Sequence, residues 1–241
     1  MGERVDLRDR DRTTDRQRRT GWWVVAGGVL LAVVVALAVR PWQGGEDGDA
    51  YLSVPRGDAD AAELVLDAQA GQVRVERGAP AGALLDARAT GEGRAASRDD
   101  AGSTHEVRLA GADASVRLAD DVAWTLRLTV GADAVHVDLS ALDLASFVVA
   151  GGAGEVDLRL PAPADDGAAG DLQVGADAIT VRVPDGTGAR VHVTAGAGVA
   201  LVDGERSEGV GAGTELTAGD GAGWDLTLSG GTGTFTLTST P

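Results

Sequence analysis

The stretch VGADAVHVDLS, residues 130–140, joins a corner of small residues to a short alternating strand. From Val135 to Ser140, apolar and polar side chains alternate strictly, which is typical of a strand with one buried face. The same arrangement returns as GGAGEVDLRLP at 151–161 and as VGADAITVRVP at 174–184. The chain therefore repeats one unit, in which a Gly/Ala/Asp corner leads into a strand.

Copies of this corner recur along most of the chain. From residue 69 to residue 195, successive copies begin 19 to 23 residues apart, and a nearly fixed period of this size indicates a repeat architecture. The clear copies begin at Gln69, Ala112, Gly131, Gly152, Gly175 and Gly231, and weaker ones begin near Gly91 and Ala195.

Stacked copies can share one apolar face, which a single copy cannot bury. Each copy would add one strand spacing of about 4.8 Å. The sequence therefore predicts an all-β fold, a β-solenoid with one rung per copy, over residues 61–241. Trp224 begins a strand where the period breaks, and we expect it in a terminal cap. The predicted inward residues are Val73, Val75, Val116, Leu118, Val135, Val137, Val156, Leu158, Ile179, Val181, Phe235 and Leu237.

A β-sandwich of antiparallel hairpins is the alternative architecture. Asp185-Gly186 and Asp203-Gly204 are both typical of the two-residue turns that such hairpins use. The nearly constant period favours the solenoid.

Residues 21–39, GWWVVAGGVLLAVVVALAV, contain no charged side chain. As a helix they would be about 28 Å long, close to the thickness of the apolar core of a bilayer. Residues 1–20 contain seven Arg, so the positive-inside rule predicts a cytoplasmic N-terminus and an extracytoplasmic segment 41–241. We therefore expect a disordered cytoplasmic tail over 1–20, one transmembrane helix over 21–39, a Gly/Asp/Ala-rich linker over 40–60, and localisation in the cell membrane.

A cleaved signal peptide is the alternative interpretation of this segment. Ala36-Leu37-Ala38 offers a small-residue cleavage site, and Arg18-Arg19 is a twin arginine. The apolar run is longer than the usual signal-peptide core, which favours an uncleaved anchor. Gly28, Ala32 and Ala36 recur every fourth residue and would form a smooth ridge through which two membrane helices can pair, so the segment also predicts self-association.

Beyond residue 40 the chain is strongly acidic. Residues 41–241 contain 13 Arg and 32 Asp or Glu, a net charge of −19. Such a surface repels nucleic acid, so nucleic acid is excluded as a partner. The chain has no cysteine, which excludes disulfides, thiolate metal sites and a lipoprotein anchor.

No set of residues predicts catalysis. The three histidines, His105, His136 and His192, lack metal-ligand spacing, and the last two fall at outward strand positions. Residues 103–106, Ser-Thr-His-Glu, include the residue types of a hydrolytic triad but are typical of an exposed loop. Phosphate-binding loops, zinc-protease motifs and nucleophile elbows are absent from the sequence. We therefore predict that the protein is not an enzyme, with no catalytic, cofactor-binding or metal-binding residue.

Aspartates recur at the corners of three copies, at Asp113, Asp133 and Asp177. Stacked on successive rungs, they would form a column of carboxylates that could bind calcium. Aspartate is also a standard turn residue, and glycines take the same place in other copies. The turn role is favoured, and calcium binding at these corners stays open.

Residues 124–204 resemble a known group of bacterial domains. The stretches that carry the resemblance are WTLRLTVGA, VDLSALDL, GAGEVDLRLP and GADAITVRVPDGTGARV. They are similar to the extracytoplasmic β-domains of the LiaF-like and toast-rack group, and to the adhesin-type β-repeat domains (DUF4097) of Gram-positive and actinobacterial membrane proteins. The resemblance implies a right-handed β-helical domain outside the membrane, and it supplies no site residue.

The resemblance also implies a function. LiaF-type proteins restrain a sensor histidine kinase that responds to cell-wall-active antibiotics, which implies a membrane protein partner such as a sensor kinase and a role in cell-envelope stress sensing. This chain departs from the pattern, because LiaF-type proteins usually carry several membrane helices and this sequence has one candidate. The alternative is a passive adhesin-like or structural surface protein without a regulatory role.

Overall fold

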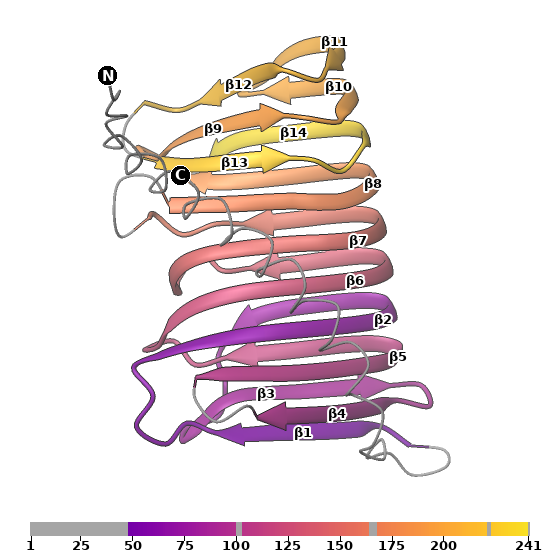
Figure 1. Cartoon of the computed structure of the whole chain (residues 1–241), viewed down its shortest axis with the longest axis vertical. Coiled ribbons are helices and arrows are strands. Elements are labelled where there is room, and N and C mark those ends of the chain that lie inside the picture. The colour runs from indigo at the N-terminus through magenta and orange to yellow at the C-terminus, as the bar shows by residue number, and fades with distance from the viewer. Residues whose placement is uncertain (1–47, 100–102, 164–167, 221–222, 241) are drawn as a thin grey trace, which may run out of the picture. The chain divides into compact units, whose positions relative to one another are not determined.

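The computed structural model describes residues 48–99, 103–163, 168–220 and 223–240, which form a stack of β-strands (Figure 1). Among these residues there is no helix long and apolar enough to span a membrane. The predicted cytoplasmic tail, residues 1–20, and the predicted membrane segment, residues 21–39, lie outside the described residues.

Five long parallel strands form the centre of the stack. Each bends once, so that its two halves lie in two facing layers (Figure 1). We call the halves before the bend layer A and the halves after it layer B, and we call one pass through both layers a rung. In spatial order the five strands are β5 (Thr104–Leu118), β2 (Ala61–Arg77), β6 (Ala123–Asp138), β7 (Asp143–Arg159) and β8 (Ala168–Pro184).

The bends fall at the small-residue corners. In β7, Gly151 has a φ of +111°, and a Cβ atom there would lie 2.1 Å from the carbonyl oxygen of Val130. A Cβ atom at Gly154 would lie 2.6 Å from the carbonyl oxygen of Asp133. Only glycine allows the next rung to come this close, so the corner composition follows from stacking at one strand spacing.

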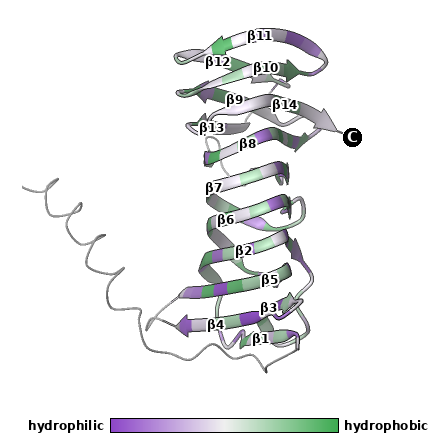
Figure 2. Ribbon diagram, turned by 90° about the vertical axis from the view of Figure 1, so that its right-hand side faces the viewer, coloured by the Kyte–Doolittle hydropathy of each residue, from purple (hydrophilic) through white to green (hydrophobic). Residues whose placement is uncertain are grey.

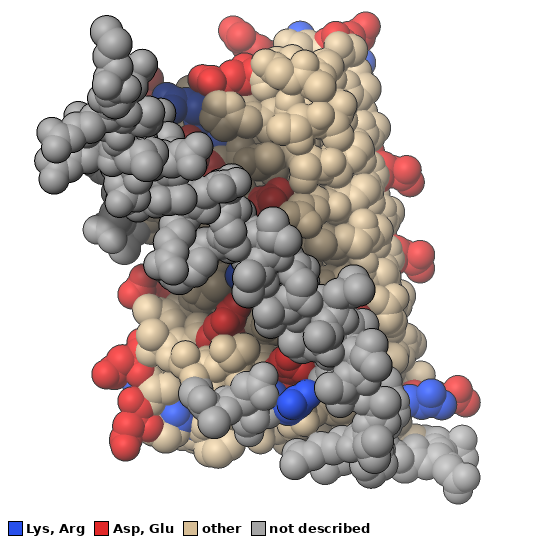
Figure 3. Space-filling model, in the orientation of Figure 1, with Lys and Arg blue, Asp and Glu red and all other residues tan. Residues whose placement is uncertain are grey.

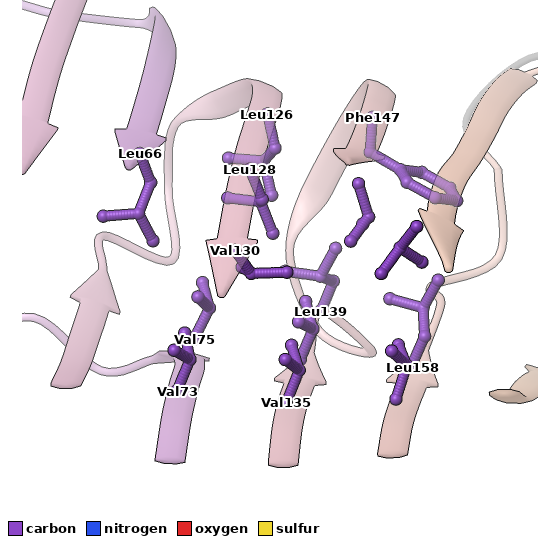
Figure 4. Close-up of a cluster of buried hydrophobic side chains, with 14 of the residues drawn as sticks. Leu66, Val73, Val75, Leu126, Leu128, Val130, Val135, Leu139, Phe147 and Leu158 are labelled. Carbon is purple, nitrogen blue, oxygen red and sulfur yellow. The ribbon is translucent and has the colours of Figure 1, made fainter. Parts of the chain in front are cut away.

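Side chains from the two layers meet between them and form the core (Figure 4). Leu128 from layer A and Val135 from layer B are at most 2% exposed. The register stacks residues of the same type, because Val135 lies opposite Val73 of β2 and Val156 of β7. Hydrophobic and hydrophilic residues alternate along the strands (Figure 2), and all the predicted inward residues are buried, which confirms the predicted strand pattern.

The rungs do not stack in chain order. β2 lies between β5 and β6, although β3 (Ala83–Thr90) and β4 (Arg94–Asp99) come between β2 and β5 along the chain. In the same way β13 (Gly223–Leu228) and β14 (Thr232–Thr240) form a rung between β8 and the rung of β9 (Gly188–Val193) and β10 (Gly196–Val202). Trp224 is the second residue of β13 and is 1% exposed inside the stack, so the prediction that it belongs to a terminal cap is wrong.

Antiparallel strands close both ends of the stack. At one end β3 and β4 run antiparallel to β5, with the weak copy at Gly91 as the bend between them, and β1 (Ala50–Pro55) pairs with β3. At the other end β11 (Glu205–Gly211) and β12 (Thr214–Ala218) pair with β10 and β9. β1 lies within residues 40–60, which the composition marks as a linker.

The two predicted hairpin turns differ in outcome. Asp203 and Gly204 do form a two-residue hairpin turn, because Val202 lies opposite Glu205 and both turn residues have positive φ. Residues 185–186 form no hairpin, since the strands that they join, β8 and β9, are separated by β13. A sandwich of antiparallel hairpins is wrong for the centre of the fold, where the ladders are parallel.

Candidate functional site

The outer face of layer B carries charged side chains around His136. The register places His136 between Arg74 of β2 and Asp157 of β7. Two residues further along the strands, Asp138 lies between Glu76 and Arg159. Neighbouring rungs thus bring two rows of three polar side chains together on one face, because every second residue of a strand points to the same side.

These six residues line a shallow depression with a volume of about 190 Å³. We call it the His136 depression; it is lined by Arg74, Glu76, His136, Asp138, Asp157 and Arg159. It holds two cationic and three acidic side chains beside a histidine, so it offers hydrogen-bond donors and acceptors of both signs at short range.

Only part of this set is engaged within the domain. Arg159 pairs with Asp138 at 3.5 Å, and Arg182 pairs with Asp157. Arg74, Glu76 and His136 make no hydrogen bond or ion pair with another residue that the structure describes. Three polar side chains with unused hydrogen-bonding capacity therefore face solvent in one depression.

A second polar cluster lies on the same face, at the β1 end. Asp86 of β3 is 3% exposed, and its carboxylate accepts hydrogen bonds from the Tyr51 hydroxyl and from Nη2 of Arg117, the latter at 2.7 Å. The hydrogen bond to Asp86 raises the pKa of Tyr51 above its ordinary value of 10.0, and Asp86 also raises the pKa of Arg117. A buried carboxylate needs such partners, so this cluster holds β1, β3 and β5 together.

Comparison with known proteins gives the family. The family described as the N-terminal domain of toast_rack (DUF2154) matches residues 43–182. The chain belongs to the toast-rack family. This confirms the resemblance to the toast-rack group and the repeated all-β architecture. Comparison with curated proteins finds no match.

One solved structure is similar to this toast-rack chain. It is described as a "putative cell adhesion protein" from Clostridium sporogenes, with a TM-score of 0.61 and 14% sequence identity over 79% of this chain and 99% of that one. At this identity the likeness is one of fold.

The toast-rack fold keeps the histidines apart. His136 lies on layer B, whereas His192 lies on layer A, 3.6 Å from a carboxylate oxygen of Glu215. His105 belongs to the start of β5, opposite Leu64, which is a core position. The expectation of an exposed loop at 103–106 is therefore wrong for Thr104 onward, because these residues pair with β2 and β4.

The corner aspartates do not converge either. Ala132 lies opposite Ala153 and Ala134 opposite Glu155, so the residue of β7 beside Asp133 is Gly154. Asp133 and Asp177 therefore lie two rungs apart, with this glycine between them. Asp113 lies opposite Gln72, at another register position. Single acidic side chains project from the bends (Figure 3), and the described part of the chain contains no group of three or more His, Asp or Glu that could hold a metal.

Sequence reasoning missed both polar clusters. Arg74 and His136 belong to copies that are not consecutive along the chain, and they meet only because β2 is inserted beside β6. The alternation did place His136 outward, which was the one available signal. Tyr51 seemed part of a linker, and nothing in its neighbourhood indicated Asp86 as a partner.

Proposed function

We propose that the chain is a single-pass membrane protein that displays its toast-rack domain outside the cell as an interaction module. The charge-free segment 21–39 and the seven Arg before it support an N-in anchor. The family and the similarity to a structure described as a "putative cell adhesion protein" support a surface interaction domain.

The observation that carries this proposal is the His136 depression. Arg74 and His136 share this depression without a hydrogen bond or ion pair to another described residue, and Glu76 beside them has only the charge of Arg117 opposite it and no hydrogen bond. A ligand with both donors and acceptors fits such a set, and a protein segment has both. Nucleic acid does not fit, because the domain is strongly acidic.

The finer part of the proposal is a role in cell-envelope stress. A segment of a membrane protein partner, such as a sensor kinase, would bind in the His136 depression, and this binding would regulate the partner. Deletion of residues 41–241 should then change the response of the cell to cell-wall-active antibiotics. An unchanged response would leave the domain as a passive adhesin-like surface module.

Site-directed photocrosslinking tests the contact surface. The chain contains no cysteine, so a single His136→Cys variant can carry a thiol-reactive photocrosslinker in native membranes. His192→Cys is the matched control, because it replaces the same residue type on the other layer. The proposal expects one membrane protein to be captured from position 136 and not from 192. Equal capture from both positions, or capture of cell-wall material only, would favour the passive alternative.

A further inference from the structure

The stack has two ends, and the strands there have neighbours on one side only. Among the described residues, β1 pairs with β3 alone, whereas β11 and β12 pair with β10 and β9 alone. The free edge of such a strand presents unpaired backbone N–H and C=O groups, which can pair with another strand. The two ends differ in how they protect that edge.

The β11–β12 end is protected. β11 and β12 carry Glu205, Arg206, Glu208 and Glu215, a net charge of −2. Gly209 and Gly213 have positive φ, which interrupts the regular edge. Charged side chains and irregular backbone are the features by which edge strands avoid pairing.

The β1 edge is less protected. β1 reads AYLSVP and contains no charged residue, and its protecting features, Pro55 and the register shift between Val54 and Pro55, lie at the C-terminal end of the strand. Residues 50–54 pair regularly with β3, and Tyr51, 57% exposed, is the large hydrophobic side chain that stands out as exposed in the described part of the chain. β1, β3 and β4 together carry three Arg and two Asp, a net charge of +1. Residues 41–241 as a whole have a net charge of −19, so the repulsion between two copies is weakest at this end.

We propose that β1 pairs antiparallel with β1 of a second copy of this chain, so that the sheet continues across a two-fold axis. The protected β11–β12 end excludes a head-to-tail filament, and a closed dimer with identical contacts is then the assembly that uses the free edge. Two β1 strands can also lie opposite each other without bringing like charges together, because β1 has no charged residue.

The short connection between the candidate membrane segment and β1 favours a second copy of this chain as the partner at the β1 edge. The ten residues 40–49 connect the candidate membrane segment to β1 and reach at most about 35 Å. Copies anchored in one membrane would therefore hold their β1 edges close to the same surface, where they can meet. Residues 41–47, or a strand from another protein, are the competing occupants.

The register of such a pair is limited to two positions. Ala50 and Val54 are buried, whereas Tyr51, Ser53 and Pro55 face outward. If the sheet continues with its buried face on one side, each residue of one β1 must lie opposite a residue of the other β1 whose side chain points to the same face. With near-complete overlap of the two strands, either Leu52 or Ser53 then lies opposite the same residue of the second copy. Opposite residues in an antiparallel pair are close enough for a disulfide.

Cysteine crosslinking of the full-length chain in native membranes tests the proposal. Leu52→Cys and Ser53→Cys are made singly in a chain that has no other cysteine, with exposed Thr217→Cys in β12 as the control for collisions. We expect a disulfide-linked dimer from one β1 variant, at a several-fold higher fraction than from Thr217→Cys. Equal fractions at both ends, or no dimer from either β1 variant, would overturn the proposal.

A charge placed on the edge provides the second readout. Ser53 is exposed, so Ser53→Lys leaves the fold intact but places two like charges near the axis, while Thr217→Lys is the matched control. Native mass spectrometry of the full-length protein in detergent should show a dimer fraction that is several-fold lower for Ser53→Lys than for the natural chain and Thr217→Lys; pairing of the predicted membrane segments would add equally to all three. Equal dimer fractions in Ser53→Lys and Thr217→Lys, or a natural chain that is monomeric, would contradict β1 pairing.

Discussion

The ring of Phe147 lies against the ring of Trp224, with centroids 5.6 Å apart and planes inclined by 59°. Phe147 belongs to β7 and Trp224 to β13, and β8 runs between these strands. The contact exists because β8 has Gly170 opposite Phe147, so the space of a missing side chain holds the aromatic ring. A glycine in mid-strand thus joins the central rungs to the C-terminal rung.

Gly170→Ala should destabilise the domain. A Cβ atom at this position would lie 2.3 Å from two ring carbons of Phe147 and 2.8 Å from Leu226. Overpacking of this kind costs about 1–3 kcal/mol in the free energy of unfolding, which denaturant titration measures. Gly152→Ala is the matched control, because nothing lies within 4 Å of its Cβ position. If steric overlap is the cause, Phe147→Leu should restore part of the loss in the double variant.

Removal of residues 221–241 should unfold more than the deleted rung. β13 and β14 are the strands that connect β8 to β9 and β10, so their loss leaves the strands from β9 to β12 without a neighbour in the stack. We expect the backbone amides of residues 188–218 to lose their protection against hydrogen exchange. The control replaces residues 205–218, the end strands, with a short flexible linker, and residues 123–184 should then stay protected. Retained protection of 188–202 after the first deletion would contradict the insertion of β13.

The repeat, the strand pattern and the inward residues could be predicted because they depend on local alternation alone. The order of the rungs could not, because every rung presents much the same Val and Leu columns to its neighbours. Val75 would fit beside Val116 or Val137 equally well, and in the structure it lies opposite both. Trp224 resembled Trp124 in sequence, and each donates its indole N–H to a backbone carbonyl at 2.9 Å, but this likeness did not reveal which rung Trp224 joins.

The same limit applies to the polar clusters. His136 was placed outward by alternation, whereas its neighbour Arg74 depends on the insertion of β2, which no local pattern encodes. Asp86 lies in a stretch where the alternation is interrupted by consecutive buried residues, and its partner Tyr51 comes from a segment rich in turn residues. Long-range pairing, rather than composition, creates both clusters.

Asp203→Ala should weaken the β10–β11 hairpin and its link to β14. Asp203 has a φ of +46°, and its carboxylate accepts hydrogen bonds from the backbone N–H of Ser239 at 3.0 Å and of Gly219 at 3.3 Å. Loss of these bonds and of a residue that tolerates positive φ should cost about 1–2 kcal/mol in the free energy of unfolding. Asp203→Asn keeps an acceptor and tolerates this φ, so its loss should be smaller. An equal loss in both variants would show that the carboxylate charge, rather than the turn, is what matters.

Alkaline titration of Tyr51 tests the Asp86 cluster directly. The chain has one tyrosine, so tyrosinate absorbance reports Tyr51 alone. The hydrogen bond to Asp86 raises the pKa of Tyr51 above 10.0, because ionisation would remove the donor and place two negative charges together. Since the folded-state pKa lies above the unfolded-state value, this interaction stabilises the fold fully below pH 10 or so and is lost as pH rises through the raised pKa. In Asp86→Asn the neutral amide removes the charge repulsion, and the titration should move back toward its ordinary value. A natural chain whose tyrosine titrates at the ordinary value, unchanged by Asp86→Asn, would show that the hydroxyl does not bond to Asp86 in solution.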